Sequence, residues 1–133
     1  MTQSEAERVI GGSLAIEGDS GWKNCGYTPT AQLPPGVHAM VEDGRIARIE
    51  VNDGTVPTAE GARIGDSEDR IRQLYPGGVV TTPHKYTSGH YLTVTPSAPS
   101  DSLYRLIFET DGARVTRFRA GRLPPVAYVE GCG

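Results

Sequence analysis

The sequence contains few cysteines, few aromatic residues and no long apolar run. Among its 133 residues are two cysteines, one tryptophan and two phenylalanines, and aromatic residues make up 7% of the chain. No apolar run approaches the roughly 20 residues that a membrane-spanning helix needs. The formal net charge of −3 gives no overall attraction to nucleic acid or to an anionic membrane surface. The sequence therefore predicts no membrane span and no nucleic-acid partner.

Recognisable catalytic motifs are also missing. The chain contains no G-x-S-x-G nucleophile elbow, no phosphate-binding loop, no dinucleotide fingerprint and no H-E-x-x-H pair. Glu42, Asp43, Glu109 and Asp111 lie at predicted hairpin turns, where turn chemistry and solvent exposure account for them. His38, His84 and His90 match the spacing of no common metal site, so we interpret them as surface or loop histidines. We expect a protein that is not an enzyme and that holds no cofactor and no metal.

The two cysteines, Cys25 and Cys132, stand far apart, and neither belongs to a C-x-x-C pair. They are either two unrelated thiols or the two ends of one disulfide. A bridge would close a loop of about a hundred residues and stabilise the fold by roughly 4 kcal/mol in the chain-entropy model. It would also order a tail rich in glycine and proline. We predict the bridge, which implies an oxidising compartment, periplasmic or secreted.

What the sequence does contain is a pattern that occurs twice. Residues 40–51 and 107–120 share an apolar pair, a Glu, an Asp-Gly turn and then an alternating run with an Arg at the same place. An amphipathic segment with a helix-capping pattern precedes each run, at residues 2–11 and 67–76. The echo predicts two tandem units of about 65 residues, each a helix followed by an antiparallel hairpin.

The predicted fold class is therefore α+β, with two tandem helix-plus-antiparallel-strand repeats that form one sheet and two short helices packed on one face. We expect a single domain over residues 1–133, because neither half alone would bury enough apolar surface. The first repeat is expected at about residues 1–60, the second at about 61–120, and a C-terminal tail at 121–133. The second helix should run over residues 67–75, with Asp66 or Ser67 as its cap and Ile71, Leu74 and Tyr75 facing inward. Strands are expected at residues 14–16, 37–41, 45–51, 79–82, 90–95, 103–109 and 114–120.

The start of the chain differs between the two predicted repeats. Residues 61–66 lead into the second helix, whereas Met1 stands directly before the first helix cap, Thr2. Our hypothesis is that Met1 is an internal residue of a longer precursor whose leader is absent from this chain.

These features resemble a known fold. The opening of residues 1–6 (MTQSEA) is similar to the capped start of the beta-lactamase inhibitory proteins, which consist of two tandem helix-then-strands repeats, and residues 65–69 (GDSED) resemble a diverged copy. The small outer-membrane-assembly lipoproteins carry one similar unit. The two hairpin runs and residues 128–132 (YVEGC) also resemble a group of uncharacterised bacterial extracytoplasmic proteins. The resemblance covers about residues 1–120, and it implies an extracytoplasmic binding or inhibitory module.

A set of arginines forms the first candidate binding site. Alternation along the predicted strands places these arginines on the sheet face opposite the helices, while Phe118 points into the core. Guanidinium groups beside tyrosines suit carboxylates and are enriched at protein interfaces. A merely solvated sheet face is the alternative. The arginines are Arg48, Arg105, Arg117 and Arg119.

The segment of residues 84–91 forms the second candidate site. Its candidate contact residues are Tyr86, Ser88, His90 and Tyr91. The run from Ser88 to Tyr91 loosely resembles the S-G-x-x-Y theme of periplasmic lysozyme inhibitors. An ordinary polar loop between two strands is the alternative.

The predicted function is a non-enzymatic extracytoplasmic binding or inhibitory module for a protein partner of unknown identity. The alternative is a small-ligand carrier or enzyme with a pocket between the repeats, and a lysozyme-inhibitor-like activity is a minor alternative. A flat or convex arginine–tyrosine face favours a protein partner, whereas a deep polar cavity favours a small ligand.

Overall fold

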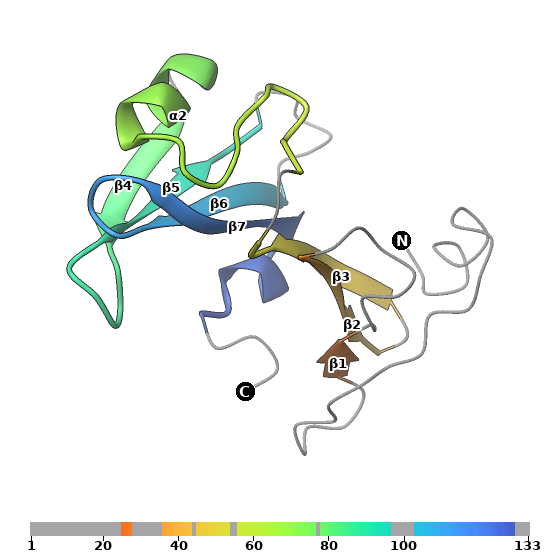
Figure 1. Ribbon diagram of the computed structural model, residues 1–133. Coiled ribbons are helices and arrows are strands. Elements are labelled where there is room, and N and C mark those ends of the chain that lie inside the picture. Colours follow the sequence, from red (N-terminus) through yellow and green to blue (C-terminus); the bar gives the residue numbers. More distant parts are fainter. Residues whose placement is uncertain are drawn as a thin grey trace.

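The computed structural model describes residues 25–27, 36–43, 45–53, 56–76, 78–96 and 103–129. Within these ranges the chain forms a seven-stranded antiparallel sheet, one α-helix and one 3-10 turn (Figure 1). The strands are β1 (Cys25–Tyr27), β2 (Val37–Glu42), β3 (Arg45–Val51), β4 (Val79–Pro83), β5 (His90–Val94), β6 (Tyr104–Thr110) and β7 (Val115–Arg122). The helix is α2 (Glu68–Leu74), and the 3-10 turn is η3 (Pro125–Ala127).

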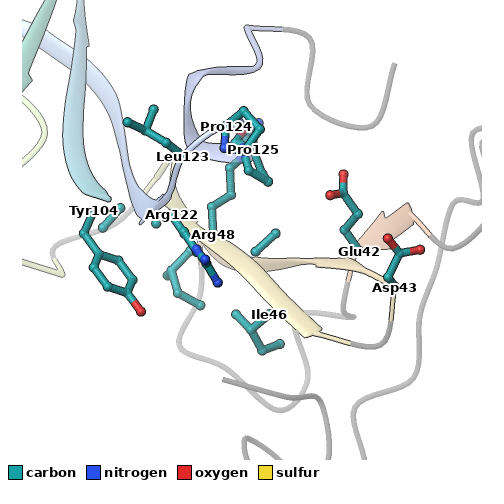
Figure 2. A pocket seen from close by; sticks show the side chains of 13 residues that line it. Glu42, Asp43, Ile46, Arg48, Tyr104, Arg122, Leu123, Pro124 and Pro125 are labelled. Atoms are coloured by element: carbon teal, nitrogen blue, oxygen red, sulfur yellow. Dashed lines mark hydrogen bonds between the residues drawn. The ribbon is translucent and has the colours of Figure 1, made fainter. Parts of the chain in front are cut away.

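The sheet joins two groups of strands. Its order is β1-β2-β3-β7-β6-β5-β4, so β1 to β3 form one meander, β4 to β7 form another, and β3 and β7 connect them. The connecting ladder runs from Val51 opposite Phe118 to Arg48 opposite Gly121. Beyond Arg48 and Gly121 no further residues of β3 and β7 pair, and a groove lies between the two strands (Figure 2).

Both long hairpins contain a β-bulge soon after their turn. In the β2–β3 hairpin, Met40 pairs with Arg48 but Val41 pairs with Ile46, so one extra residue lies on β3. The β6–β7 hairpin has the same irregularity, because Glu109 pairs with Arg117 and Thr110 pairs with Val115. An extra residue moves the following side chains to the other face of the sheet. Val115 therefore lies in the core together with Phe118, although strict alternation from Phe118 would place it on the opposite face of the sheet.

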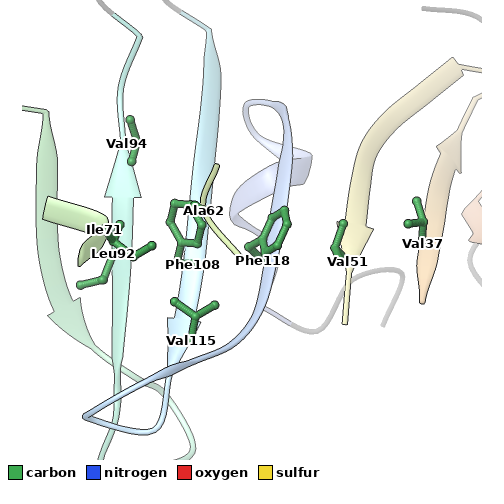
Figure 3. Close-up of a cluster of buried hydrophobic side chains, with 9 residues drawn as sticks. All are labelled: Val37, Val51, Ala62, Ile71, Leu92, Val94, Phe108, Val115 and Phe118. Carbon is green, nitrogen blue, oxygen red and sulfur yellow. The ribbon is translucent and has the colours of Figure 1, made fainter. Parts of the chain in front are cut away.

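The larger of two hydrophobic clusters among the described residues lies on the face of the sheet that α2 partly covers (Figure 3). Its centre is aromatic, with the rings of Phe108 and Phe118 5.4 Å apart and the rings of Tyr75 and Phe108 5.9 Å apart. The prediction that Phe118 faces the core is confirmed. The buried residues of this core are Val37, Val51, Ala62, Ile71, Leu92, Val94, Phe108, Val115 and Phe118.

Helix α2 begins as the sequence predicts. The Ser67 hydroxyl oxygen accepts a hydrogen bond of 3.1 Å from the Arg70 N–H and so caps the first turn. Ile71 is fully buried, and Leu74 and Tyr75 pack against the core. The helix covers the part of the sheet formed by β4 to β7 (Figure 1).

The predicted fold class, α+β with two tandem helix-plus-strand repeats, is wrong. The fold is dominated by one sheet, and α2 is the single α-helix within the described ranges. Among the described residues the two groups of strands also differ, because three strands precede α2 and four follow it. The similarity of residues 40–51 and 107–120 has another cause. Both segments form a hairpin with an Asp-containing turn followed by a bulge, and such hairpins require similar residues in a similar order. The helix expected at residues 2–11 and the strand expected at 14–16 lie outside the described residues.

The C-terminal segment contains structure that the sequence did not predict. After β7 the chain turns back, and η3 packs against β3, β6 and β7 on the face opposite α2 (Figure 1). Val126 is completely buried there. Cys25 begins β1, but Cys132 lies outside the described residues, so the disulfide stays a prediction. None of the described helices has the length and apolar character needed to cross a membrane.

Candidate functional site

The connection between β4 and β5 projects from one end of the sheet (Figure 1). It spans residues 84–89 and ends with Ser88 and Gly89, two residues that favour turns. Its two ends meet where the His84 N–H donates to the Gly89 carbonyl oxygen at 3.1 Å. The Lys85 N–H donates to the Tyr91 hydroxyl at 3.1 Å, and the Gly89 N–H donates to the Thr87 hydroxyl at 3.0 Å. We call residues 85–88 the loop tip.

His84 fixes the start of this loop. Its Nδ1 accepts a hydrogen bond of 3.0 Å from the Tyr86 N–H, so the ring proton is on Nε2. Nε2 donates to Glu109 Oε1 at 2.7 Å, and the ring stacks on Tyr91 with centroids 4.6 Å apart. Both ring nitrogens are therefore engaged, and neither is left to act on a substrate. The geometry makes His84 an anchor of the loop.

Glu109 connects this anchor to the arginines of β7. The side chain is buried, and its second oxygen, Oε2, accepts a hydrogen bond from Arg119 Nη1. Arg117 Nε lies 3.7 Å from Oε1, and the Arg119 guanidinium lies over the Tyr91 ring at 5.9 Å. The structure therefore brings the two predicted regions together, because Tyr91 and Glu109 touch both the loop and the arginines.

His90 and Glu68 fix the other end of the loop. His90 Nδ1 lies 2.7 Å from Glu68 Oε2, which also accepts a hydrogen bond of 2.5 Å from the Thr110 hydroxyl. The Thr110 hydroxyl oxygen in turn accepts from the N–H groups of His90 and Gly112, at 3.1 and 3.2 Å. Burial raises the pKa of Glu68, but the hydrogen bonds from Thr110 and His90 outweigh it, so this pKa lies below its ordinary value of 4.5.

The loop also packs tightly against the β6–β7 turn. Gly89 is buried, and a Cβ atom there would stand 1.9 Å from the Thr110 carbonyl oxygen. A Cβ atom on Gly112 would lie 3.7 Å from the Ser88 carbonyl oxygen. The two loops therefore lie side by side, and Gly89 is required by this close approach. In the run that resembles the lysozyme-inhibitor theme, Gly89 therefore has a packing role, whereas Ser88 is exposed.

The loop tip itself is exposed. Lys85, Tyr86, Thr87 and Ser88 all face solvent, and 61% of Tyr86 is accessible. The Lys85 ammonium lies 5.2 Å from the centroid of the Tyr86 ring, within cation–π range. The loop tip is therefore exposed, aromatic and cationic. The two ends of the loop are fixed by the contacts of His84 with Glu109 and of His90 with Glu68.

The predicted exposed arginine face is wrong for two of its four members. Arg48 and Arg119 are only 3% and 4% exposed, because η3 covers them. Arg48 Nη1 donates to the carbonyl oxygens of Pro125 and Tyr128 at 3.1 and 2.6 Å, and Arg119 Nε donates to the Val126 carbonyl at 2.6 Å. These two arginines hold the C-terminal turn.

Arg48 and Arg119 carry buried charges. Desolvation lowers the pKa of Arg119, the Glu109 carboxylate opposes that effect, and the nearby Arg48 adds to it. Arg48 Nη2 also lies 3.3 Å from Glu50 Oε2. Each buried arginine thus faces a carboxylate.

The other two predicted arginines lie apart from each other. The Arg117 side chain is 54% exposed and borders the loop through Glu109. Arg105 lies near the far end of β6 and donates from Nη1 to the Tyr104 carbonyl at 2.6 Å. Of the four arginines, only Arg117 lies exposed beside the loop.

Of the residues that hold the loop, only His90 was among the predicted site residues, and it was predicted as a contact residue; Glu68, His84 and Glu109 were not predicted. His84 and Glu109 are 25 positions apart, and Glu68 and His90 are 22 apart, so no local spacing joins them. No cluster of three or more histidine, cysteine, aspartate or glutamate side chains that could hold a metal occurs in the described part of the chain. The remaining histidine, His38, lies on β2, opposite Glu50.

Comparison with known proteins gives no relative from which a function could be transferred. No protein-family model matches the chain. Searches of curated proteins and of solved structures also return no match. Any functional assignment therefore depends on the geometry of the chain itself.

Proposed function

We propose that the protein is a non-enzymatic binding module that presents the loop tip to a protein partner, with Tyr86 as the main anchor. The observation that carries this proposal is the contrast between the exposed tip and its fixed base. His84 contacts Glu109 at one end of the loop, and His90 contacts Glu68 at the other, each at 2.7 Å.

A fixed base favours tight binding for an entropic reason. A loop that must become ordered on association loses conformational freedom, which weakens the complex. Here five backbone N–H groups, four in the loop and one in the residue that follows it, donate hydrogen bonds. They belong to His84, Lys85, Tyr86, Gly89 and His90. Much of the ordering has therefore occurred before a partner arrives.

The chemistry of the tip also suits a protein surface. Tyrosine is enriched among residues that dominate binding energy, because its ring contributes a large contact area with few rotatable bonds. Lys85 beside Tyr86 adds a positive charge, and Thr87 and Ser88 offer hydroxyl groups for hydrogen bonds. A projecting tip of this kind fits a concave partner surface, as in a protein inhibitor.

Capture from fractions of the native cell, with a matched control, tests this proposal. The wild-type chain, Tyr86→Ala and Tyr128→Ala would be immobilised, since Tyr128 is also exposed (40%) but lies at the C-terminal turn. We expect a protein that is retained by the wild type and by Tyr128→Ala and is lost with Tyr86→Ala. Equal retention by all three baits would contradict the proposal. Finding the partner only in the cytoplasmic fraction would contradict the extracytoplasmic location, which is also part of the proposal.

A further inference from the structure

A groove lies between β3 and β7, away from the loop tip. The two strands pair as far as Arg48 and Gly121, and beyond these residues they line a cavity of about 610 Å3 (Figure 2). This volume falls within the range of pockets that hold small ligands. The close contact of Gly121 with β3 marks the end of the ladder, because a Cβ atom on Gly121 would stand 2.5 Å from the Ala47 carbonyl oxygen.

One wall of the groove is held firmly in place. Leu123, Pro124 and Pro125 form this wall, and buried Arg48 donates hydrogen bonds to the carbonyl oxygens of Pro125 and Tyr128. The Leu123 N–H donates to the Leu103 carbonyl at 2.7 Å, which ties the wall to β6. The groove is therefore part of the folded structure and does not require a partner to form.

Exposed apolar side chains line this groove. Ile49 and Tyr104, which both line it, are two of the six large apolar side chains that are exposed in the described part of the chain. Ile46 adds a third apolar side chain to the lining. Exposed apolar surface of this kind favours an apolar ligand.

The charges that line the groove are separated. Arg122 lies next to Tyr104, its register partner on β6, whereas Glu42 and Asp43 lie at the opposite end (Figure 2). Within the described ranges, the Arg122 guanidinium takes part in no ion pair and no side-chain hydrogen bond. An anionic group is therefore attracted to the Arg122 end and repelled from the other end.

We propose that this groove binds a small organic carboxylate. The carboxylate pairs with Arg122, whose planar guanidinium matches it geometrically, and the apolar body lies against Tyr104, Ile49 and Ile46. This site is separate from the loop tip. The protein would thus have one site for a small ligand and another for the proposed protein partner.

Three probes of equal chain length test the site on the wild-type protein. Decanoate, decanol and decylamine would be titrated calorimetrically, each below the concentration at which it self-associates. We expect saturable binding of one decanoate, about tenfold tighter than decanol, because a charge-assisted hydrogen bond contributes that much. Decylamine should bind more weakly than decanoate. Amide NMR shifts on adding decanoate should map to Ile46, Ile49 and Tyr104.

Variants then identify the carboxylate contact. Arg122→Gln should reduce the affinity for decanoate to that for decanol, while Arg70→Gln, which removes an exposed arginine from α2, should leave it unchanged. Tyr86→Ala should also bind decanoate normally, which separates this site from the loop tip. Absence of saturable binding by the wild type, equal affinity for the three probes, unchanged binding by Arg122→Gln or NMR shifts outside the groove would each overturn the proposal.

Discussion

Gly89 packs so closely on Thr110 that a Cβ atom at position 89 would stand 1.9 Å from the Thr110 carbonyl oxygen. This contact places the β4–β5 loop beside the β6–β7 turn. It also connects the backbone of the loop to the Thr110 hydroxyl, which accepts from the His90 N–H and donates to Glu68. The position of the loop tip therefore depends on a residue with no side chain.

Gly89→Ala should separate the two loops. The added methyl group cannot fit against the carbonyl oxygen, so we expect the free energy of unfolding to fall by about 2 kcal/mol or more. Chemical denaturation measures this loss. Gly78→Ala is the control. A Cβ atom at position 78 would lie 3.7 Å from its nearest neighbour, the Thr95 carbonyl oxygen, which is an ordinary van der Waals distance. If Gly89→Ala is as stable as Gly78→Ala, the loop does not pack as described.

Glu68 should make the stability of the fold depend on pH. Its pKa is lowered in the folded protein, so its contribution to stability is fully present above the ordinary value of 4.5 and is lost as the pH falls through the lowered pKa. We expect the stability of wild type to decline more steeply in this acidic range than that of Glu68→Gln. Denaturation curves between neutral and acidic pH test this, with Asp69→Asn, an exposed carboxyl on the same helix, as the control. Identical pH dependence of wild type and Glu68→Gln would refute the role of Glu68.

The buried and exposed arginines of β7 should respond differently to substitution. Arg119→Gln removes the charged donor to Glu109 Oε2 and to the Val126 carbonyl, both in a buried setting, so we expect a loss of about 3 kcal/mol or more. Arg117→Gln should change stability by less than about 1 kcal/mol, because its partly exposed ion pair contributes little. Thermal and chemical denaturation of the two variants supply the comparison. Equal losses would mean that η3 does not cover Arg119 in solution.

Hairpins and the helix were the predictable parts of this fold, because their signals are local. The turn at Asp43, the cap at Ser67 and the inward side of Ile71 all follow from residues within a few positions of one another. The prediction of a tandem repeat was wrong because two hairpins of the same type need similar sequences even when the structure around them differs.

The site could be predicted only in part, because its contacts are distant in sequence. Alternation placed Arg119 on the face opposite the core, yet nothing local shows that residues 125–127 return to cover that face. The bulge after the β6–β7 turn also moved Val115 into the core, and a one-residue shift of this kind has no reliable signature. The segment that contains the loop tip was singled out by a loose motif resemblance at residues 88–91, but its two histidine–glutamate anchors depend on the finished fold.

The predicted bridge between Cys25 and Cys132 has a direct chemical test. If it forms, the unreduced, denatured protein contains no free thiol, and reduction lowers the melting temperature because the unfolded chain gains freedom. Ellman titration counts the thiols. Two free thiols in protein isolated from its native compartment would remove the bridge and the main argument for an extracytoplasmic location.

The affinity of the captured partner for the loop-tip variants tests the central claim most directly. Dissociation constants would be measured for the wild type, Tyr86→Ala and the matched control Tyr128→Ala. We expect Tyr86→Ala to weaken binding by about thirtyfold, as the loss of a central interface tyrosine typically does, and Tyr128→Ala to bind like the wild type. A Tyr86→Ala variant that is folded and binds the partner as tightly as the wild type would contradict the account of the loop tip as the binding element.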